Sequence, residues 1–206
     1  MRLPIIFSAA LLLSASACAA PAKPAAPAVA NGKATALFAG GCFWCMESDF
    51  EHLPGVISVE SGYTGGPEKN PTYEQVSDHA TGHAESVRVT YDAAKVSYAQ
   101  LVDYFWHHID PTVKDQQFCD HGPQYRSAIF PLDAEQTKVA TESKEALIKS
   151  GKLEHVYTEV TPAGPFWPAE DYHQDYYKKN PVRYNYYRFG CGRDARVEEV
   201  WGAKKN

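Results

Sequence analysis

The sequence predicts an α+β fold, a two-layer arrangement in which helices pack on one sheet within a single domain. Two kinds of segment alternate along the chain. Some are short and have alternating apolar residues, as strands do, and others have apolar residues at helical spacing. The glycine-rich phosphate loops GxGxxG and GxxxxGK[ST] are both absent. About 175 residues follow the expected leader and linker, a length that suits one domain with a full core.

The first residues are expected to be removed before the protein folds. Residues 1–20 combine a basic start, a short apolar run and small residues, a pattern typical of a signal peptide. Residues 21–32 are rich in proline and alanine and are expected to form a linker. The folded domain should therefore occupy residues 33–206, with a C-terminal tail from about residue 181.

The leader implies a periplasmic or exported protein. Cys18 lies in a segment similar to the lipobox of bacterial lipoproteins, but Ala15 stands where leucine or valine is usual. We therefore expect ordinary cleavage near residues 17–20, and anchoring through a lipidated Cys18 is the alternative.

Alternating and β-branched residues predict the strands. They are expected over 35–38, 55–63, 85–91, 127–130 and 155–160. Residues 110–124 are polar and contain glycine and proline, so we expect a loop there, before the strand over 127–130.

Helices are predicted between these strands from apolar periodicity and capping residues. They are expected over 42–52, 73–78 (a single turn), 97–109, 133–151 and 170–179. Ser97 should cap the third, Asp133 with Gln136 forms a capping-box pattern for the fourth, and Pro181 should end the last. The tail beyond residue 181 shows little periodicity, so no element is predicted there.

Cys42 is the strongest candidate for a nucleophile. It follows a glycine pair at the predicted turn from strand to helix, where unpaired backbone N–H groups converge. That setting favours the thiolate over the thiol. Phe43 and Trp44 would form the wall of a small apolar pocket, whereas a buried cysteine that only fills space is the less favoured interpretation. Cys45 lies one turn further on the same face, either to pair with Cys42 or to pack.

Other candidate residues are weaker when taken singly. Glu85 opens a strand, and if desolvated it would stay protonated and act as a general acid; a solvated surface glutamate is the alternative. Tyr73 and Tyr125 lie in loops, where they either pack or donate hydrogen bonds to a substrate oxygen. A net charge of −5 gives no sign of nucleic-acid binding.

A metal site is not expected. The chain has one Cys-x-x-Cys pair, Cys42 and Cys45, without a second matching pair. His107 and His108 are adjacent and would face opposite sides of a helix, which makes them a poor chelate.

Taken together, separated blocks of the chain resemble the A-type peptide methionine sulfoxide reductases. The blocks are Gly41-Cys42-Phe43-Trp44, Gly62-Tyr63-Thr64-Gly65-Gly66, Asn70-Pro71-Thr72-Tyr73, Thr81-Gly82-His83-Ala84-Glu85, Asp120-His121-Gly122, Gln124-Tyr125-Arg126-Ser127 and Ala169-Glu170-Asp171-Tyr172-His173-Gln174. They follow the family order from about residue 35 to 181. The resemblance implies a two-layer α/β sandwich with a ferredoxin-like core.

The resemblance also implies an activity, the thiol-dependent reduction of methionine S-sulfoxide, free or in proteins. Cys42 would attack the sulfoxide sulfur and become a sulfenic acid. Glu85 would protonate the sulfoxide oxygen with help from Tyr73 and Tyr125, and Asp120 would support that network. Phe43 and Trp44 would receive the methyl group.

No metal or organic cofactor is implied, and a dithiol reductant of the thioredoxin type would regenerate a monomeric enzyme. Many relatives have glycine at the position of Cys45 and a pair of cysteines in the tail, whereas this tail has Cys191 alone. Cys191, flanked by glycines, is the expected resolving cysteine, with Cys45 as the alternative and a relay through both open. Cys119, next to Asp120, could also lie near the site.

Two other functions compete with this interpretation. A thiol–disulfide oxidoreductase could use Cys42 and Cys45, but it would leave Glu85 and the tyrosines unexplained. A non-catalytic binding domain could hold its cysteines in two structural disulfides.

Overall fold

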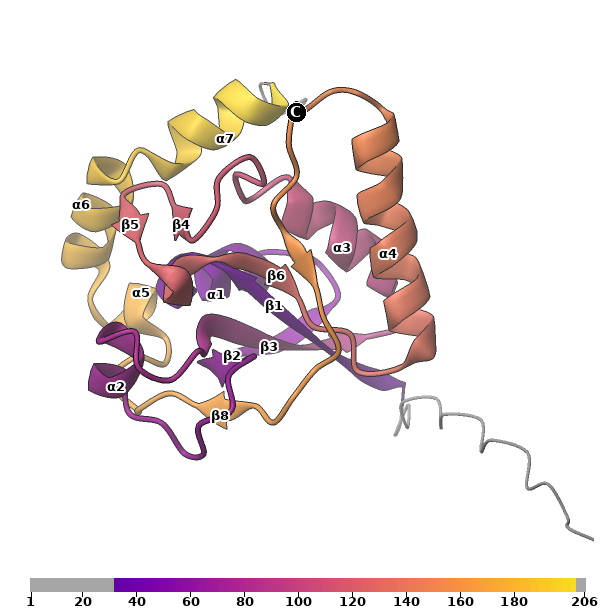
Figure 1. Cartoon of the computed structure of the whole chain (residues 1–206). Helices are drawn as coiled ribbons and strands as arrows, with labels where there is room; N and C mark the ends of the chain where they lie inside the picture. The colour runs from indigo at the N-terminus through magenta and orange to yellow at the C-terminus, as the bar shows by residue number, and fades with distance from the viewer. Residues whose placement is uncertain (1–31, 203–206) are drawn as a thin grey trace, which may run out of the picture.

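The structure is a computed structural model that describes residues 32–202 (Figure 1). The expected signal peptide, Cys18 and the linker up to residue 31 lie outside the described residues. Within residues 32–202, no helix combines the length and the apolar character that a membrane crossing requires.

A six-stranded sheet forms one layer of the fold, in the order β7-β6-β1-β3-β2-β8. Its strands are β1 (Lys33–Gly40), β2 (Val56–Thr64), β3 (Ala84–Asp92), β6 (Ser127–Ile129), β7 (Glu159–Val160) and β8 (Trp167–Pro168). All neighbours are antiparallel except β6 and β7. A separate two-stranded hairpin, β4 (Gln116–Gln117) with β5 (Asp120–His121), lies within the segment that was expected to be a loop.

Helices form the second layer and the C-terminal region (Figure 1). They are α1 (Phe43–Glu51), α2 (Tyr73–Ser77), α3 (Tyr98–Trp106), α4 (Ala134–Lys149), α5 (Tyr176–Lys179), α6 (Pro181–Gly190) and α7 (Arg193–Trp201), with a 3-10 turn, η1, at Pro123–Tyr125. Helix α1 packs on β1, β2 and β3, and α3 packs on β1 and against α4.

The central strand β1 is buried on both faces, which explains its apolar sequence. Side chains alternate between the faces of a strand. Phe38 lies on the helical side, where its ring stacks on Phe50 and Phe105 with centroids 4.9 and 5.1 Å apart. Leu37, on the opposite side, belongs to a smaller apolar cluster against which Phe166 packs. The predicted two-layer α+β fold is therefore confirmed, with extended chain covering the second face.

Capping residues place the helix starts largely as predicted. Ser97 accepts a hydrogen bond from the Gln100 N–H and completes a capping box at α3. At α4, Asp133 accepts from the Gln136 N–H, but the Gln136 side chain accepts from Leu132 and donates to Thr35. Only half of the predicted capping box forms there, because the glutamine amide satisfies neighbouring backbone groups instead.

Two predictions for the C-terminal half are wrong. The strand expected over 155–160 is reduced to β7, and the helix expected over 170–179 is reduced to α5 and preceded by turns. Helix α5 does end before Pro181, as predicted, but Pro181 then begins α6, where proline fits because the first N–H groups of a helix have no partner within it. The tail is helical, although its sequence shows little apolar periodicity.

Buried arginines help to anchor the tail helices, in addition to the aromatic contacts of Tyr184 and Tyr187 with α1 and α5. Arg193, which is 2% exposed, donates to the backbone carbonyls of Gly40 and His108 at 3.2 and 2.9 Å. Its guanidinium also lies 3.5 Å from Asp49 of α1, which pairs with Arg188 of α6 at 2.8 Å. Both arginines therefore converge on one carboxylate in the last turn of α1.

Replacing Arg193 tests this anchor. Arg193→Ala leaves Asp49 with one partner and removes the donor that Arg193 gives to two carbonyls, so we expect the free energy of unfolding to fall by about 3 kcal/mol in urea titrations. Arg183→Ala, at an exposed position of α6, is the control and should cost less than about 0.5 kcal/mol. Equal effects of the two changes would contradict the anchor.

Candidate active site

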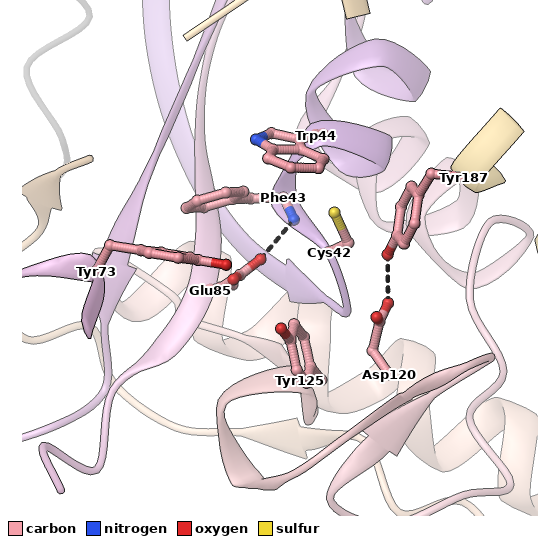
Figure 2. Close-up of a pocket in the computed structure, with 8 residues that line it drawn as sticks. All are labelled: Cys42, Phe43, Trp44, Tyr73, Glu85, Asp120, Tyr125 and Tyr187. Carbon is pink, nitrogen blue, oxygen red and sulfur yellow. Dashed lines mark hydrogen bonds between the residues drawn. The ribbon is translucent and has the colours of Figure 1, made fainter. Parts of the chain in front are cut away.

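A cavity of about 100 Å³ opens at the N-terminus of α1 (Figure 2). It is lined by Cys42, Phe43, Trp44, Tyr73, Glu85, Asp120, Tyr125 and Tyr187. The structure thus brings together every residue that the sequence placed in a catalytic or substrate-binding role, and adds Tyr187. The cavity is small enough to receive only the end of a side chain.

The glycine pair before Cys42 is required by close packing. Gly41 has φ +83°, and a Cβ there would lie 2.5 Å from Cβ of Gln117. A Cβ at Gly40 would meet Met46 and Ile109 at 2.6 and 2.7 Å. The chain can therefore turn tightly from β1 into α1 only with glycines, and this turn places Cys42 at the helix N-cap.

Burial raises the pKa of the Cys42 thiol well above its ordinary value, and Cys45 and Glu85 add to this effect. A hydrogen-bonding contact with the Tyr187 hydroxyl acts in the opposite direction. The expectation of a resting thiolate at Cys42 is therefore wrong, because the loss of solvation outweighs the helix N-terminus. The side chain is 6% exposed, and it is a thiol until a base removes its proton.

Glu85 is buried beside Cys42, as a general acid requires. It lies near the start of β3 with 3% exposure, and its Oε2 accepts the N–H of Phe43 at 3.0 Å. Burial raises its pKa to about 8, and the charge of Asp120 contributes in the same direction. The carboxyl group is therefore mostly neutral at pH 7 and can donate a proton.

Two tyrosines reach the same cavity from separate elements. Tyr73 begins α2, where its N–H donates to Glu170 at 2.9 Å, and Tyr125 ends η1. Both hydroxyl groups point into the cavity near Glu85 (Figure 2). Burial raises the pKa of each, so both remain hydrogen-bond donors at neutral pH.

The aromatic wall is fixed from outside by the segment around His173. Trp44 donates through its indole N–H to His173 Nδ1 at 3.0 Å and stacks on Tyr176 with centroids 3.7 Å apart. Phe43 packs against the same histidine at 4.9 Å. The wall is therefore rigid before any ligand enters.

Tyr187 is the residue of the site that sequence reasoning missed. It belongs to α6, in the tail where no element was predicted, and its hydroxyl donates to Asp120 Oδ2 at 2.5 Å. The ring of Tyr187 meets the ring of Trp44 edge-on, with centroids 5.9 Å apart. The run of tyrosines before Cys191 was the one sequence signal that could have drawn attention to it.

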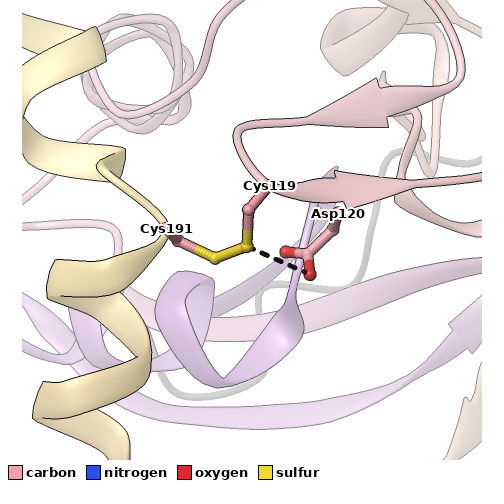
Figure 3. A group of neighbouring side chains, drawn as sticks. All are labelled: Cys119, Asp120 and Cys191. Carbon is pink, nitrogen blue, oxygen red and sulfur yellow. Dashed lines mark hydrogen bonds between the residues drawn. A yellow bond between two sulfur atoms is a disulfide. The ribbon is translucent and has the colours of Figure 1, made fainter.

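The cysteines form two pairs of different character. Cys119 and Cys191 are joined by a disulfide with Cα atoms 4.9 Å apart (Figure 3). Cys42 and Cys45 are free and buried, with their sulfurs in hydrogen-bonding contact. The alternative of two structural disulfides is therefore wrong.

Two clusters within residues 32–202 have the ligand types of a metal site. One is Asp120 with Cys119 and Cys191, whose sulfurs are already bonded to each other. The other contains Glu47, whose carboxylate oxygens accept from the Ser61 hydroxyl and the Asp175 N–H. Neither offers an uncommitted ligand set.

Fold and site together define a thiol-dependent oxidoreductase that presents proton donors to a small polar group. Residues 34–205 match the family model described as peptide methionine sulfoxide reductase. The chain is 49% identical over 202 residues to peptide methionine sulfoxide reductase MsrA 2 of Caulobacter vibrioides, covering 98% of each chain. It is also 49% identical over 177 residues to MsrA of Bacillus licheniformis, covering 85% of this chain and 98% of the relative.

Solved structures agree with these sequence relatives. Methionine sulfoxide reductase A of Corynebacterium diphtheriae aligns with a TM-score of 0.65 at 36% identity, over 73% of this chain and 76% of the other. Reduced Mxr1 of Saccharomyces cerevisiae aligns with a TM-score of 0.67 at 31% identity, over 73% and 87%. The chain belongs to the peptide methionine sulfoxide reductase family, and its type is MsrA.

The raised pKa of Glu85 predicts how stability depends on pH. The folded state holds a proton that the unfolded carboxyl, with a pKa near 4.5, releases. Stability should therefore fall as the pH rises from about 4.5 to about 8. The fall in the free energy of unfolding between pH 4.5 and 8 should amount to a few kcal/mol in wild type and be absent in Glu85→Gln. Urea unfolding at a series of pH values measures both.

Glu145→Gln, on the exposed side of α4, is the matched control for this titration. Glu47, whose pKa burial raises to about 7, stays in both proteins and cancels in the comparison. Parallel pH profiles of wild type and Glu85→Gln would contradict the prediction.

Proposed function

We propose that the cavity at Cys42 is where this chain carries out the reaction of its family, the reduction of methionine S-sulfoxide to methionine. The observation that carries the proposal is the neutral, buried Glu85 carboxyl in the same cavity as the Cys42 thiol. A sulfoxide oxygen leaves sulfur only when it is protonated, and a neutral acid near pH 7 supplies that proton.

The cavity distinguishes the two sulfoxide epimers because the sulfur, the methyl group and the oxygen each face a different part of its lining. The sulfoxide sulfur faces Cys42, the methyl group packs on Phe43 and Trp44, and the oxygen points to Glu85 between the tyrosine hydroxyls. Exchanging the oxygen and the methyl group would place a polar atom on the aromatic wall and leave the buried donors unpaired. The arrangement therefore favours one epimer, which we propose to be the S form.

The first step transfers oxygen from substrate to enzyme. The Cys42 sulfur attacks the sulfoxide sulfur and forms an S–S bond as the oxygen takes a proton from Glu85. The resulting hydroxyl then moves from the methionine sulfur to the Cys42 sulfur as the S–S bond breaks, which releases methionine and leaves a Cys42 sulfenic acid. One thiol and one sulfoxide give one sulfenic acid and one thioether, so no further reductant is consumed in this step.

Cys45 is proposed to resolve the sulfenic acid. The sequence favoured Cys191, but Cys191 is bonded to Cys119, whereas the Cys45 sulfur contacts Cys42. Condensation of the Cys45 thiol with the sulfenic acid forms a disulfide and releases water. An external dithiol of the thioredoxin type then restores both thiols and becomes a disulfide itself. Resolution by Cys191, directly or after Cys45, is the other outcome that the test below allows.

The cellular setting is proposed from the leader sequence. A periplasmic or exported reductase, working as a monomer, would repair methionines of exported proteins. The proposed reductant must then be delivered to an oxidising compartment.

Turnover of the two separated epimers by the mature protein tests the function. With dithiothreitol as reductant, wild type should reduce the S epimer and leave the R epimer, and Cys42→Ser should abolish the reaction because it lacks the nucleophile. Tyr186→Phe, at an exposed position outside the cavity, is the comparison variant and should match wild type. A well-folded wild type that reduces neither epimer would overturn the proposal.

Disulfide mapping after a single oxidation identifies the resolving thiol. One equivalent of sulfoxide without reductant should convert wild type and Cys191→Ser to a Cys42–Cys45 bridge. Cys45→Ser should instead retain a sulfenic acid that dimedone traps. A Cys42–Cys191 bridge in wild type would reassign the resolving role to Cys191.

A further inference from the structure

We infer that Tyr187 is a further catalytic residue, which passes the proton of the Cys42 thiol to the Asp120 carboxylate as the nucleophile forms. The inference rests on the proposed function, since it takes Cys42 as the nucleophile. It gives Asp120 a different role from the one implied by the family resemblance, where this residue supports the donors around the sulfoxide oxygen.

The geometry places Tyr187 between the two groups that exchange the proton. Its hydroxyl donates to Asp120 Oδ2 at 2.5 Å, and Tyr187 lines the same cavity as Cys42, with its hydroxyl on the side of the Cys42 sulfur (Figure 2). A phenol that donates to a carboxylate still has lone pairs to accept from a thiol. Figure 2 shows this pair on one side of Cys42, with Glu85 and Tyr73 on the other.

A base is needed because the nucleophile is buried as a thiol. Glu85 cannot serve, since it must remain protonated for the sulfoxide oxygen. Tyr73 and Tyr125 face the same sulfur from the substrate side, and burial keeps both phenols neutral. From α1, the Cys45 sulfur is the one other acceptor in contact with Cys42.

The surroundings of Asp120 strengthen it as a proton acceptor. Burial raises its pKa, while the Tyr187 hydroxyl, Arg193 and His121 all act to lower it. The net effect is a raised pKa, so the Asp120 carboxylate holds a proton more tightly than a solvated aspartate does. The nearby Glu85 is neutral, so it does not repel this charge.

The disulfide holds the two members of the relay together. Cys119 precedes Asp120, with Sγ 3.7 Å from Asp120 Oδ1, and Cys191 follows the helix that carries Tyr187 (Figure 3). The bond thus ties the hairpin of β4 and β5 to the end of α6. We assign Cys119 and Cys191 as positioning residues, which act through Asp120 and Tyr187.

Protons balance in this scheme. The Cys42 proton moves to the Tyr187 oxygen while the Tyr187 proton moves to Asp120, so the phenol is unchanged. The thiolate attacks the sulfoxide, and Glu85 gives its proton to the oxygen that ends on Cys42. Asp120 finishes protonated and Glu85 ionised, and a proton returned through solvent restores both.

Alkylation of Cys42 tests the relay without using the reductase reaction. Iodoacetamide modification of the mature protein, located by mass spectrometry, should be about tenfold slower in Tyr187→Phe than in wild type near pH 7, with its pH midpoint moved upward. Tyr186→Phe, 83% exposed on the same helix, should match wild type. An alkylation profile of Tyr187→Phe that coincides with wild type would overturn the relay.

Steady-state kinetics give the second readout. Tyr187→Phe should lower kcat about 100-fold at neutral pH, the lower range for a lost acid–base group, with KM unchanged. The ratio of wild-type to variant kcat at the same pH should shrink as pH rises, because both proteins lose the Glu85 proton alike. Asp120→Asn should do the same, and the double variant should be no slower than either, because one relay is lost once. Additive losses, or losses independent of pH, would contradict the relay.

These readouts separate the inference from the proposed function. A wild type that fails to reduce sulfoxides, but whose Cys42 alkylation depends on Tyr187, would refute the function and support thiol activation by the relay. A wild type that reduces the S epimer, with Tyr187→Phe equal to it in both assays, would refute the relay alone. Cys45→Ser checks the competing acceptor. If Cys45→Ser slows the alkylation of Cys42 about tenfold and Tyr187→Phe leaves it unchanged, the base is Cys45 and the relay is refuted.

Discussion

The hydrogen bond from the Phe43 N–H to Glu85 is the contact on which the site depends. It joins the first residue of α1 to the third strand of the chain, and so fixes the distance between nucleophile and acid. Its formation requires the tight turn that Gly40 and Gly41 permit. The bond also satisfies a helix N–H that has no partner within the helix, so the acid and the helix start stabilise one another.

The parts of the site that the sequence predicted share a physical origin. Cys42 and its glycines lie at a junction of strand and helix, and Glu85 lies at the start of a strand, so local pattern was sufficient to place them on elements. Their meeting in one cavity is a matter of tertiary structure: β1 and β3 pair directly, and this pairing could be anticipated only from the family resemblance. The protonation state of Cys42 was mispredicted because local sequence reports the helix N-terminus but not the depth of burial.

The tail could not be predicted for a different reason. Its helices are held by Arg188 and Arg193, which converge on Asp49, and only a few of their apolar side chains are buried. Periodicity analysis detects apolar faces, and it is insensitive to a helix that is anchored by a buried guanidinium. Tyr187 was missed together with the helix that carries it, although that helix supplies one wall of the cavity.

Burial has opposite consequences for the two reacting groups, and this conflict organises the chemistry. Excluding water raises the pKa of Glu85 and so makes it an acid at neutral pH, but the same exclusion keeps the Cys42 thiol protonated. A site that depended on burial alone would have a good acid and a poor nucleophile. A second carboxylate of the cavity, linked to Cys42 through a phenol, resolves the conflict, because the Tyr187 hydroxyl and Arg193 favour the charged form of Asp120 while Glu85 has no such partners. Two carboxyl groups in different surroundings thus serve the two ends of one oxygen transfer.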